Sequence, residues 1–249
     1  DPLGTKGEMI TLDGLNIILP KVPNKKQILF SDYPKKEQYW RRTEIPKGLS
    51  PDTQELFVEY IYEEFRRRRE GVWFMNNGIP VYLTGNHYFA LQWCKMEDDG
   101  KYKQFIYAQR DMFYFSKACV IDTRCIGELF VKSRRTGFTY QILDVFLDEI
   151  TSTINATMGM TSKSDKDAGK CFSKFSYSYL NLPFFFRPVV KGKEDSKNFL
   201  EFAKPSDNTK EAKKAKNTNT DDYLNSKIDY LPTKNDAYDG QKMFRYLGD

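Results

Sequence analysis

Apolar residues recur at helical spacing in four stretches of this chain. In residues 53–69 they form one helical face, and Ser50-Pro51-Asp52 in front of them is typical of a helix start. The same spacing predicts helices at 111–121, 140–147 and 165–179. Each of these helices is expected to bury one face against the rest of the chain.

Shorter apolar runs predict strands between these helices. Residues 72–75 and 79–82 flank Asn76-Asn77-Gly78, which favours the positive φ angles of a tight hairpin turn. Pro80 marks the second strand of this hairpin as an edge strand. Further strands are expected at 129–131, 156–161, 198–203, 227–231 and 243–248. Strands that alternate with helices predict an α/β fold with a parallel sheet and crossover helices.

The chain divides into three expected parts. Residues 1–52 are rich in Pro, Gly and Lys and predict an extended N-terminal arm with little regular structure. Residues 53–103 predict an α/β accessory region of a helix, a hairpin and a short helix. Residues 104–249 hold the parallel sheet, with a polar loop at 204–222.

Composition narrows the functional classes. The chain has 249 residues, 40% of them hydrophobic, which is enough for one or two domains. The net charge of +5 tolerates a polyanionic partner without requiring one. Four separated cysteines and a single histidine argue against a zinc site and favour reduced thiols. No apolar run approaches the roughly 20 residues of a membrane span, so no membrane partner is expected.

The apolar run 129–131 is followed by a basic loop and then by a predicted helix start. This order is the layout of a phosphate-binding loop, where helix N–H groups and a basic side chain meet an anion. In the pattern G-x-x-x-x-G-K-[ST], Gly137 and Thr139 occupy the second Gly and the Ser/Thr positions. Phe138 stands at the Lys position, and Lys132 stands at the first Gly position. A strand that ends in a solvated basic loop is the alternative interpretation.

The loop resembles the deviant Walker A motif of phage terminase large subunits, the motors that package DNA into procapsids. Its residues are Lys132, Ser133, Arg134, Arg135, Thr136, Gly137, Phe138 and Thr139. The segments Val81–Phe89 and Tyr107–Arg110 are also similar to terminases of crAss-like phages. The resemblance covers roughly residues 70–249 and implies a P-loop NTPase fold.

The resemblance implies an ATP and Mg²⁺ site built from the whole loop. Lys132 is then the catalytic cation, supported by Arg134 or Arg135, and Thr139 and Asp249 hold Mg²⁺. The strand that ends at Asp249 corresponds to a Walker B strand. Gln109 matches the residue that reads the adenine edge, since an amide donates and accepts at once. A surface glutamine at a helix start explains Gln109 equally well.

The implied function is the ATPase motor that couples ATP hydrolysis to translocation of double-stranded DNA. Its expected partners are DNA, the portal protein, a small terminase subunit and further copies in a ring, in the host cytoplasm at the procapsid portal. The nuclease domain and the water-polarising Glu of this family are expected beyond Asp249, so residues 1–249 alone are expected to be inactive. The alternatives are another nucleic-acid-dependent NTPase, such as a helicase-like translocase, and a non-hydrolysing virion or scaffold protein that retains the fold.

Two further features have competing interpretations. The run Arg66–Arg69 either contacts DNA or forms a solvated helix end matched to the helix dipole and to the preceding glutamates. His87 is expected to be a structural hydrogen-bonding residue rather than a catalyst, because no nucleophile accompanies it.

Overall fold

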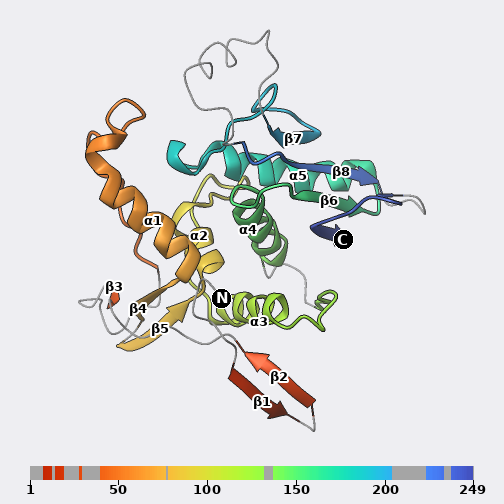
Figure 1. Ribbon diagram of the computed structural model, residues 1–249, viewed down its shortest axis with the longest axis horizontal. Helices are drawn as coiled ribbons and strands as arrows, with labels where there is room; N and C mark the ends of the chain where they lie inside the picture. Colours follow the sequence, from red (N-terminus) through yellow and green to blue (C-terminus); the bar gives the residue numbers. More distant parts are fainter. Residues whose placement is uncertain are drawn as a thin grey trace. The chain divides into compact units, whose positions relative to one another are not determined.

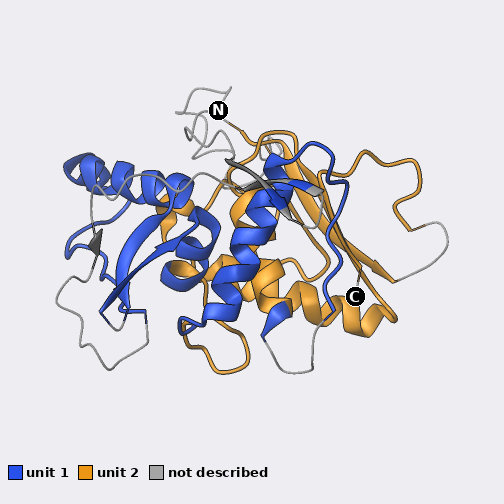
Figure 2. Ribbon diagram, turned by 90° about the horizontal axis from the view of Figure 1, so that it is seen from below, with its two compact units in different colours: residues 1–92, 103–138 blue, residues 93–102, 139–249 orange. Residues whose placement is uncertain are grey.

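The computed structural model is a mixed α/β protein that divides into two compact units (Figure 2). Unit 1 comprises Asp1–Gln92 and Lys103–Phe138, and unit 2 comprises Trp93–Tyr102 and Thr139–Asp249. The structure describes residues 8–12, 15–19, 28–29, 40–76, 78–131, 137–203, 223–232 and 237–248. The two units are taken in turn.

Unit 1 contains two small sheets and three α-helices among its described residues (Figure 1). Its elements are β1 (Glu8–Leu12), β2 (Leu15–Leu19), β3 (Ile28–Leu29), η1 (Gln54–Phe57), α1 (Val58–Glu70), β4 (Val72–Asn76), β5 (Ile79–Leu83), α2 (Gly85–Trp93) and α3 (Tyr107–Ile121). β4 and β5 form the predicted antiparallel hairpin, and β3 adds in parallel to β4. β5 is therefore an edge strand, which confirms the interpretation of Pro80.

The N-terminal arm has more regular structure than the sequence led us to expect. β1 and β2 pair as an antiparallel hairpin, and the Thr11 hydroxyl donates across it to Asn16 Oδ1 at 2.9 Å. Arg124 Nη2 donates to the carbonyl of Asn16 at 2.6 Å, which ties the hairpin to the end of α3. The missed signal is the dipeptide Asp13-Gly14 between two short apolar runs, a strong hairpin marker.

A buried carboxylate joins α1 to α2. Glu64 has no exposed surface, and it accepts bonds from the Tyr88 hydroxyl at 2.5 Å and from Arg67 Nη1 at 2.8 Å. Burial and the neighbouring Glu64 carboxylate raise the pKa of Tyr88 well above its usual value. On the next turn, the Arg68 guanidinium lies 4.4 Å from the centroid of the Phe89 ring. The buried charge of Glu64 is tolerated because the carboxylate is paired with Arg67 and hydrogen-bonded to Tyr88.

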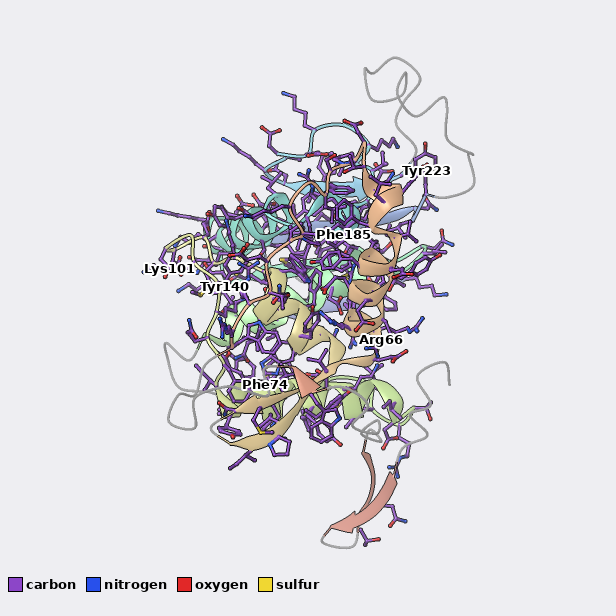
Figure 3. The ribbon with its side chains drawn as sticks, turned by 90° about the vertical axis from the view of Figure 1, so that its left-hand side faces the viewer. Arg66, Phe74, Lys101, Tyr140, Phe185 and Tyr223 are labelled. Carbon is purple, nitrogen blue, oxygen red and sulfur yellow. The ribbon has the colours of Figure 1, made fainter. Side chains whose placement is uncertain are left out.

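Aromatic rings fill the space between this helix pair and the β4–β5 hairpin. Phe74, labelled in Figure 3, contacts the rings of Trp40 and Phe105 edge-on at centroid distances of 5.3 and 5.1 Å. The Trp40 indole donates to the buried amide of Gln92 at 3.2 Å. Gln92 also donates to the carbonyl of Thr43 at 2.7 Å, so its buried amide fixes the segment that precedes η1.

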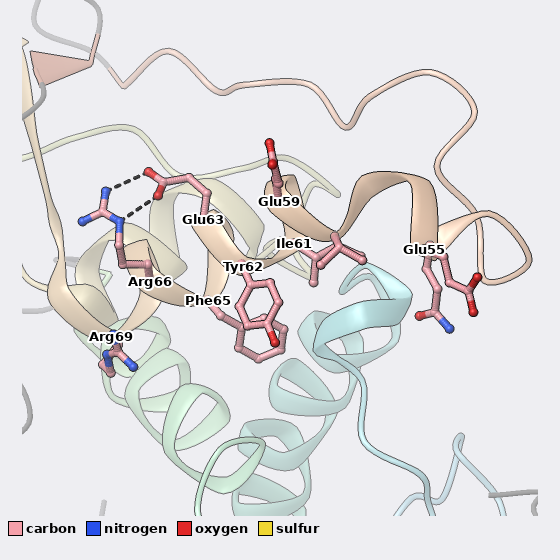
Figure 4. Close-up of a pocket in the computed structure, with 10 residues that line it drawn as sticks. Glu55, Glu59, Ile61, Tyr62, Glu63, Phe65, Arg66 and Arg69 are labelled. Atoms are coloured by element: carbon pink, nitrogen blue, oxygen red, sulfur yellow. Dashed lines mark hydrogen bonds and ion pairs between the residues drawn. The ribbon is translucent and has the colours of Figure 1, made fainter.

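The four arginines of α1 form ion pairs or ring contacts with residues of unit 1. Arg66 pairs with Glu63 (Figure 4) and with Glu70, and Arg69 pairs with Glu70. Arg67 and Arg68 make the contacts described above. The solvated and internally paired interpretation therefore accounts for this run better than a DNA contact does.

Glycine is required where α1 meets α2. A Cβ atom at Gly85 would lie 1.9 Å from the carbonyl oxygen of Arg68, so only a residue without a side chain fits. Gly71 ends α1 with a φ of +80°, a conformation that favours glycine.

Gly85→Ala should therefore destabilise the protein by about 2 kcal/mol or more, because the clashing partner is backbone rather than a flexible side chain. Urea unfolding measured by circular dichroism tests this. Gly127→Ala is the matched control, since a Cβ there meets nothing within 4 Å. Equal stability of the two variants would contradict the close approach of the helices.

His87 has a structural role, although not the expected one. Its ring is fully buried and lies between Phe113, at 4.6 Å and nearly parallel, and Phe105 at 5.9 Å. Neither imidazole nitrogen has a hydrogen-bond partner among the described residues, so the expectation of a hydrogen-bonding role was wrong. Burial, together with the nearby charges of Arg110 and Lys103, lowers the pKa of His87 to about 3.

This shift predicts acid sensitivity. The unfolded chain takes up a proton on His87 below pH of about 6.5, whereas the folded state does so only near pH 3. The free energy of unfolding should therefore fall as the pH falls between these values, by up to about 1.4 kcal/mol per pH unit. His87→Phe should flatten that part of the profile in chemical denaturation measurements. An unchanged slope in the variant would show that other groups are responsible.

Unit 2 is built on a four-stranded sheet in the order β7-β8-β6-β9 within its described residues (Figure 1). Its elements are α4 (Phe138–Ile150, whose first residue belongs to unit 1), β6 (Thr157–Ser162), α5 (Asp165–Leu180), η2 (Phe184–Phe186), β7 (Phe199–Phe202), β8 (Ser226–Pro232) and β9 (Arg245–Gly248). β6 is parallel to both β8 and β9, and β7 is antiparallel to β8. The predicted parallel sheet is confirmed for β6, β8 and β9, whereas the antiparallel β7 was not expected.

α5 connects β6 to the β7–β8 pair and packs against the sheet. Ser164 caps it by accepting from the N–H of Asp167 at 3.2 Å. Phe172 on α5 contacts the ring of Tyr230 on β8 at 5.5 Å. The loop 93–102 is held against α4, because the Tyr140 hydroxyl accepts from the N–H of Glu97 at 3.0 Å.

The expected strand at 129–131 is absent from the described residues. Leu129 and Val131 are 91% and 95% exposed, and the segment pairs with no described strand. A run of three apolar residues does not specify a strand by itself, because a strand also needs a partner for its backbone groups.

Candidate functional site

The structure describes only part of the predicted phosphate-binding loop. Gln109, Gly137, Phe138 and Thr139 are described. Lys132, Ser133, Arg134, Arg135, Thr136 and Asp249 lie outside the described residues. The geometry of the site therefore comes from the residues that flank the loop.

The chain after α3 returns along that helix and brings the two ends of the loop together. The Ser116 hydroxyl on α3 donates to Glu128 Oε2 at 2.5 Å, and the Phe115 ring contacts Phe130 at 6.1 Å. Phe130 in turn contacts Phe138 edge-on at 4.7 Å. Phe130 lies just before the loop and Phe138 is its next-to-last residue, so the contact between these two rings joins the start of the loop to its end.

Gly137 lies at the exit of this loop with a φ of +73°. This left-handed conformation is one that glycine adopts without strain. A Cβ atom at this position would lie 3.3 Å from Gln109 Nε2, so the amide of Gln109 is directly beside Gly137. Gln109, in the first turn of α3, and Gly137, near the end of the loop, are thus neighbours, although 28 positions separate them in the sequence.

Gln109 lies within a helix rather than in front of one. α3 begins at Tyr107, so the expected start at 111 was too late. From the first turn of α3 the half-buried Gln109 amide can contact either the backbone at Gly137 or a ligand bound beside it. Both the adenine-reading and the structural interpretation of this residue remain compatible with its position.

The packing of Phe138 accounts for the departure of this position from the usual motif. The residue at this position carries a cation in the standard pattern, but here its ring packs on Phe130 and anchors the loop. The cations of the loop are therefore Lys132, Arg134 and Arg135. Thr139, in the first turn of α4, is half-buried, and its hydroxyl makes no hydrogen bond within the described part of the chain.

α4 carries a buried polar stripe that the sequence analysis did not single out. Gln141, Asp144 and Asp148 recur at helical spacing, and all three are buried. The two amide atoms of Gln141 have no hydrogen-bond partner within the described ranges, whereas both aspartates have partners. The sequence signal was the appearance of polar residues at a helical period inside an otherwise apolar helix.

The carboxyl ends of β6 and β9 lie at the same edge of the unit 2 sheet. Thr161 pairs with Gly248, and the Thr161 and Tyr246 hydroxyls share a hydrogen bond of 2.6 Å. At the opposite end of β9, the Arg245 guanidinium forms two bonds of 2.8 Å with the Glu149 carboxylate on α4. This paired geometry fixes the start of β9 against the end of α4.

Other classes of site have little support in the described part of the chain. It contains no group of three or more His, Cys, Asp or Glu side chains placed to hold a metal ion. The four cysteines are thiols rather than disulfides, as predicted. Nor does any described helix combine the length and apolar character of a membrane span.

No protein-family model matches this sequence, and neither does any curated protein. The terminase resemblance therefore remains a hypothesis that rests on the loop motif and on the order of the segments around it.

The position of Gln109 gives a test that separates its two possible roles. If Gln109 reads adenine, Gln109→Ala should weaken ATP binding by about 1–2 kcal/mol, the scale of lost hydrogen bonds, and leave a pyrimidine nucleotide nearly unaffected. Calorimetric titration of both nucleotides measures the difference. Gln104→Ala, at an exposed site before α3, is the control. Equal weakening of both nucleotides would assign Gln109 to support of the loop at Gly137.

Proposed function

We propose that this chain binds Mg-ATP at the loop 132–139 and that it is the ATPase motor of a phage terminase large subunit. One observation carries the nucleotide site: a left-handed Gly137 follows the basic loop, a 13-residue helix begins at the next residue, and the Gln109 amide lies beside it. The motor assignment rests in addition on the sequence resemblance.

The described residues fit a bound phosphate. The first N–H groups of α4 have no partners within the helix and point along its axis, which favours an anion at this end. Gly137 has no side chain to obstruct such an anion. The contact between the Phe130 and Phe138 rings holds together the two segments that flank the basic residues of the loop.

In this proposal Lys132 neutralises the charge that develops on the β- and γ-phosphates, and Arg134 or Arg135 supports it. The hydroxyl of Thr139 and the carboxylate of Asp249 are the groups that hold Mg²⁺. When bound, the metal ion would supply positive charge that offsets the negative charge of the phosphates. The parallel pairing of β6 with β9 supports this role for Asp249, because residues that follow such strands lie at the edge where parallel sheets bind ligands.

The partners of this proposal follow from the motor assignment. Hydrolysis drives translocation of double-stranded DNA, with the portal protein as the docking partner and a small terminase subunit and a ring of copies as further components. The site of action is the host cytoplasm at the procapsid portal. Another nucleic-acid-dependent NTPase would use the same nucleotide site.

One observation favours a second candidate, a non-hydrolysing virion or scaffold protein. Phe138 occupies the position of the usual catalytic lysine and is engaged in packing against Phe130. If Lys132 does not replace that lysine, the fold is retained without catalysis.

A variant pair distinguishes these candidates. Mg-ATP should raise the midpoint of thermal unfolding, because a ligand that binds only the folded state stabilises it. Lys132→Ala should abolish this protection, whereas Lys193→Ala, at an exposed position between η2 and β7, should retain it. In the full-length protein Lys132→Ala should also reduce ATP hydrolysis at least about a hundredfold, the scale for loss of a charge-stabilising group.

Two results would redirect the assignment. Near-normal ATP hydrolysis by the full-length Lys132→Ala variant would move the catalytic role to Arg134 or Arg135. Protection by Mg-ATP without hydrolysis by the full-length protein, even with DNA and portal supplied, would favour the non-hydrolysing candidate.

A further inference from the structure

Two tyrosines lie on one face of the unit 2 sheet, beside Gly159 of β6. Asp229 on β8, Gly159 and Tyr246 on β9 are in register on three adjacent strands, so they share this face. The ring of Tyr238, from the segment between β8 and β9, occupies the space over Gly159. A Cβ atom at Gly159 would lie 2.4 Å from Tyr238 Cζ, so the missing side chain admits the ring.

Tyr238 is held in a backbone conformation that a large side chain rarely adopts, with a φ of +61°. Its hydroxyl donates to Asp229 Oδ1 at 2.6 Å, and its ring contacts the ring of Tyr246 at 5.9 Å. Burial and the bond to Asp229 raise the pKa of Tyr238, so this hydroxyl remains a donor. A strained residue persists only where several contacts hold it, so Tyr238 is a firm support for Tyr246.

The Tyr246 hydroxyl connects β9 to the end of β6. It shares a hydrogen bond of 2.6 Å with the hydroxyl of Thr161, which is 2% exposed. Thr161 is also the residue of β6 that pairs in register with Gly248. The Tyr246 side chain itself is 52% exposed, so burial contributes little to its orientation. Its position is therefore set by the hydroxyl bond to Thr161 and by the ring of Tyr238.

This bond lies where β9 has few other supports. Within the described residues β9 is an edge strand that pairs with β6 alone. The bond between Arg245 and Glu149 fixes the amino end of β9, and the Thr161–Tyr246 bond acts at its carboxyl end. Asp249 follows this end directly in the sequence. A carboxylate binds a metal ion tightly only when the groups behind it hold it in place.

We propose that Thr161 and Tyr246 are a positioning pair, which fixes the carboxyl end of β9 so that the next carboxylate can hold Mg²⁺ beside the nucleotide. This inference rests on the proposed function for the role of Asp249. The two hydroxyls act through the backbone of β9 rather than by contact with the metal ion. Their loss should therefore weaken binding of the nucleotide only when Mg²⁺ is present.

Calorimetric titration with ATP, in excess Mg²⁺ and in EDTA, tests the proposal. Tyr246→Phe should weaken binding of Mg-ATP about fivefold, the effect of one lost hydrogen bond, and leave binding of metal-free ATP unchanged. Thr161→Val should have the same effect, whereas Thr161→Ser keeps the hydroxyl and should bind like the wild type. Tyr230→Phe is the matched control, since the Tyr230 hydroxyl on β8 is bonded to Asn198.

A double variant shows whether the two hydroxyls act as a pair. Tyr246→Phe/Thr161→Val loses the same bond only once, so its affinity for Mg-ATP should equal that of either single variant. Thermal unfolding without ligand checks that each variant is folded.

The possible failures are distinguishable. Unchanged Mg-ATP binding in Tyr246→Phe, equal weakening with and without Mg²⁺, or losses that multiply in the double variant would overturn the positioning role and leave the nucleotide site standing. A wild-type protein that binds ATP under neither condition would instead overturn the proposed function, and this inference with it.

Discussion

The return of the chain along α3 is the constraint on which the candidate site depends. Contacts at Phe115 and Ser116 hold the segment that leaves the helix, and that segment delivers the loop back to the first turn, where Gln109 lies. Within the described ranges, the segment that leads into the loop forms no strand. The residues that flank the loop are held by aromatic contacts and one side-chain hydrogen bond.

The sequence predicted those elements in which the pattern of apolar and polar residues repeats over a long enough stretch to identify a helix or a strand. α1, α5, β6 and the β4–β5 hairpin have bounds close to the expected ranges, because periodic burial and turn chemistry agreed in each of them. The exposed segment 129–131 shows where this reasoning fails. Its residues are as apolar as those of a real strand, but strand formation depends on a partner that local sequence does not specify.

The buried polar residues were the other feature that the sequence did not reveal. Glu64, Gln92 and Gln141 are each fully or almost fully buried, yet in the sequence they look like the polar side of a surface helix. Glu64 and Gln92 are buried because specific partners from other elements satisfy them. Such partners are fixed by tertiary structure, so a one-dimensional pattern of hydrophobicity assigns these residues to the wrong face. In the candidate site, the proximity of Gln109 to Gly137 was likewise invisible before the course of the intervening chain was known.

Because each unit is built from two separate segments of the chain, the units cannot fold one after the other during translation. The chain passes between the units after residues 92, 102 and 138, so neither unit is one continuous segment. During translation, unit 1 lacks α3 until most of residues 103–138 have left the ribosome. By then the loop 93–102, which belongs to unit 2, has already emerged without the elements that it packs against. A nascent chain of this kind matures as a whole rather than one unit after the other, and no single cut between the units would release either of them intact.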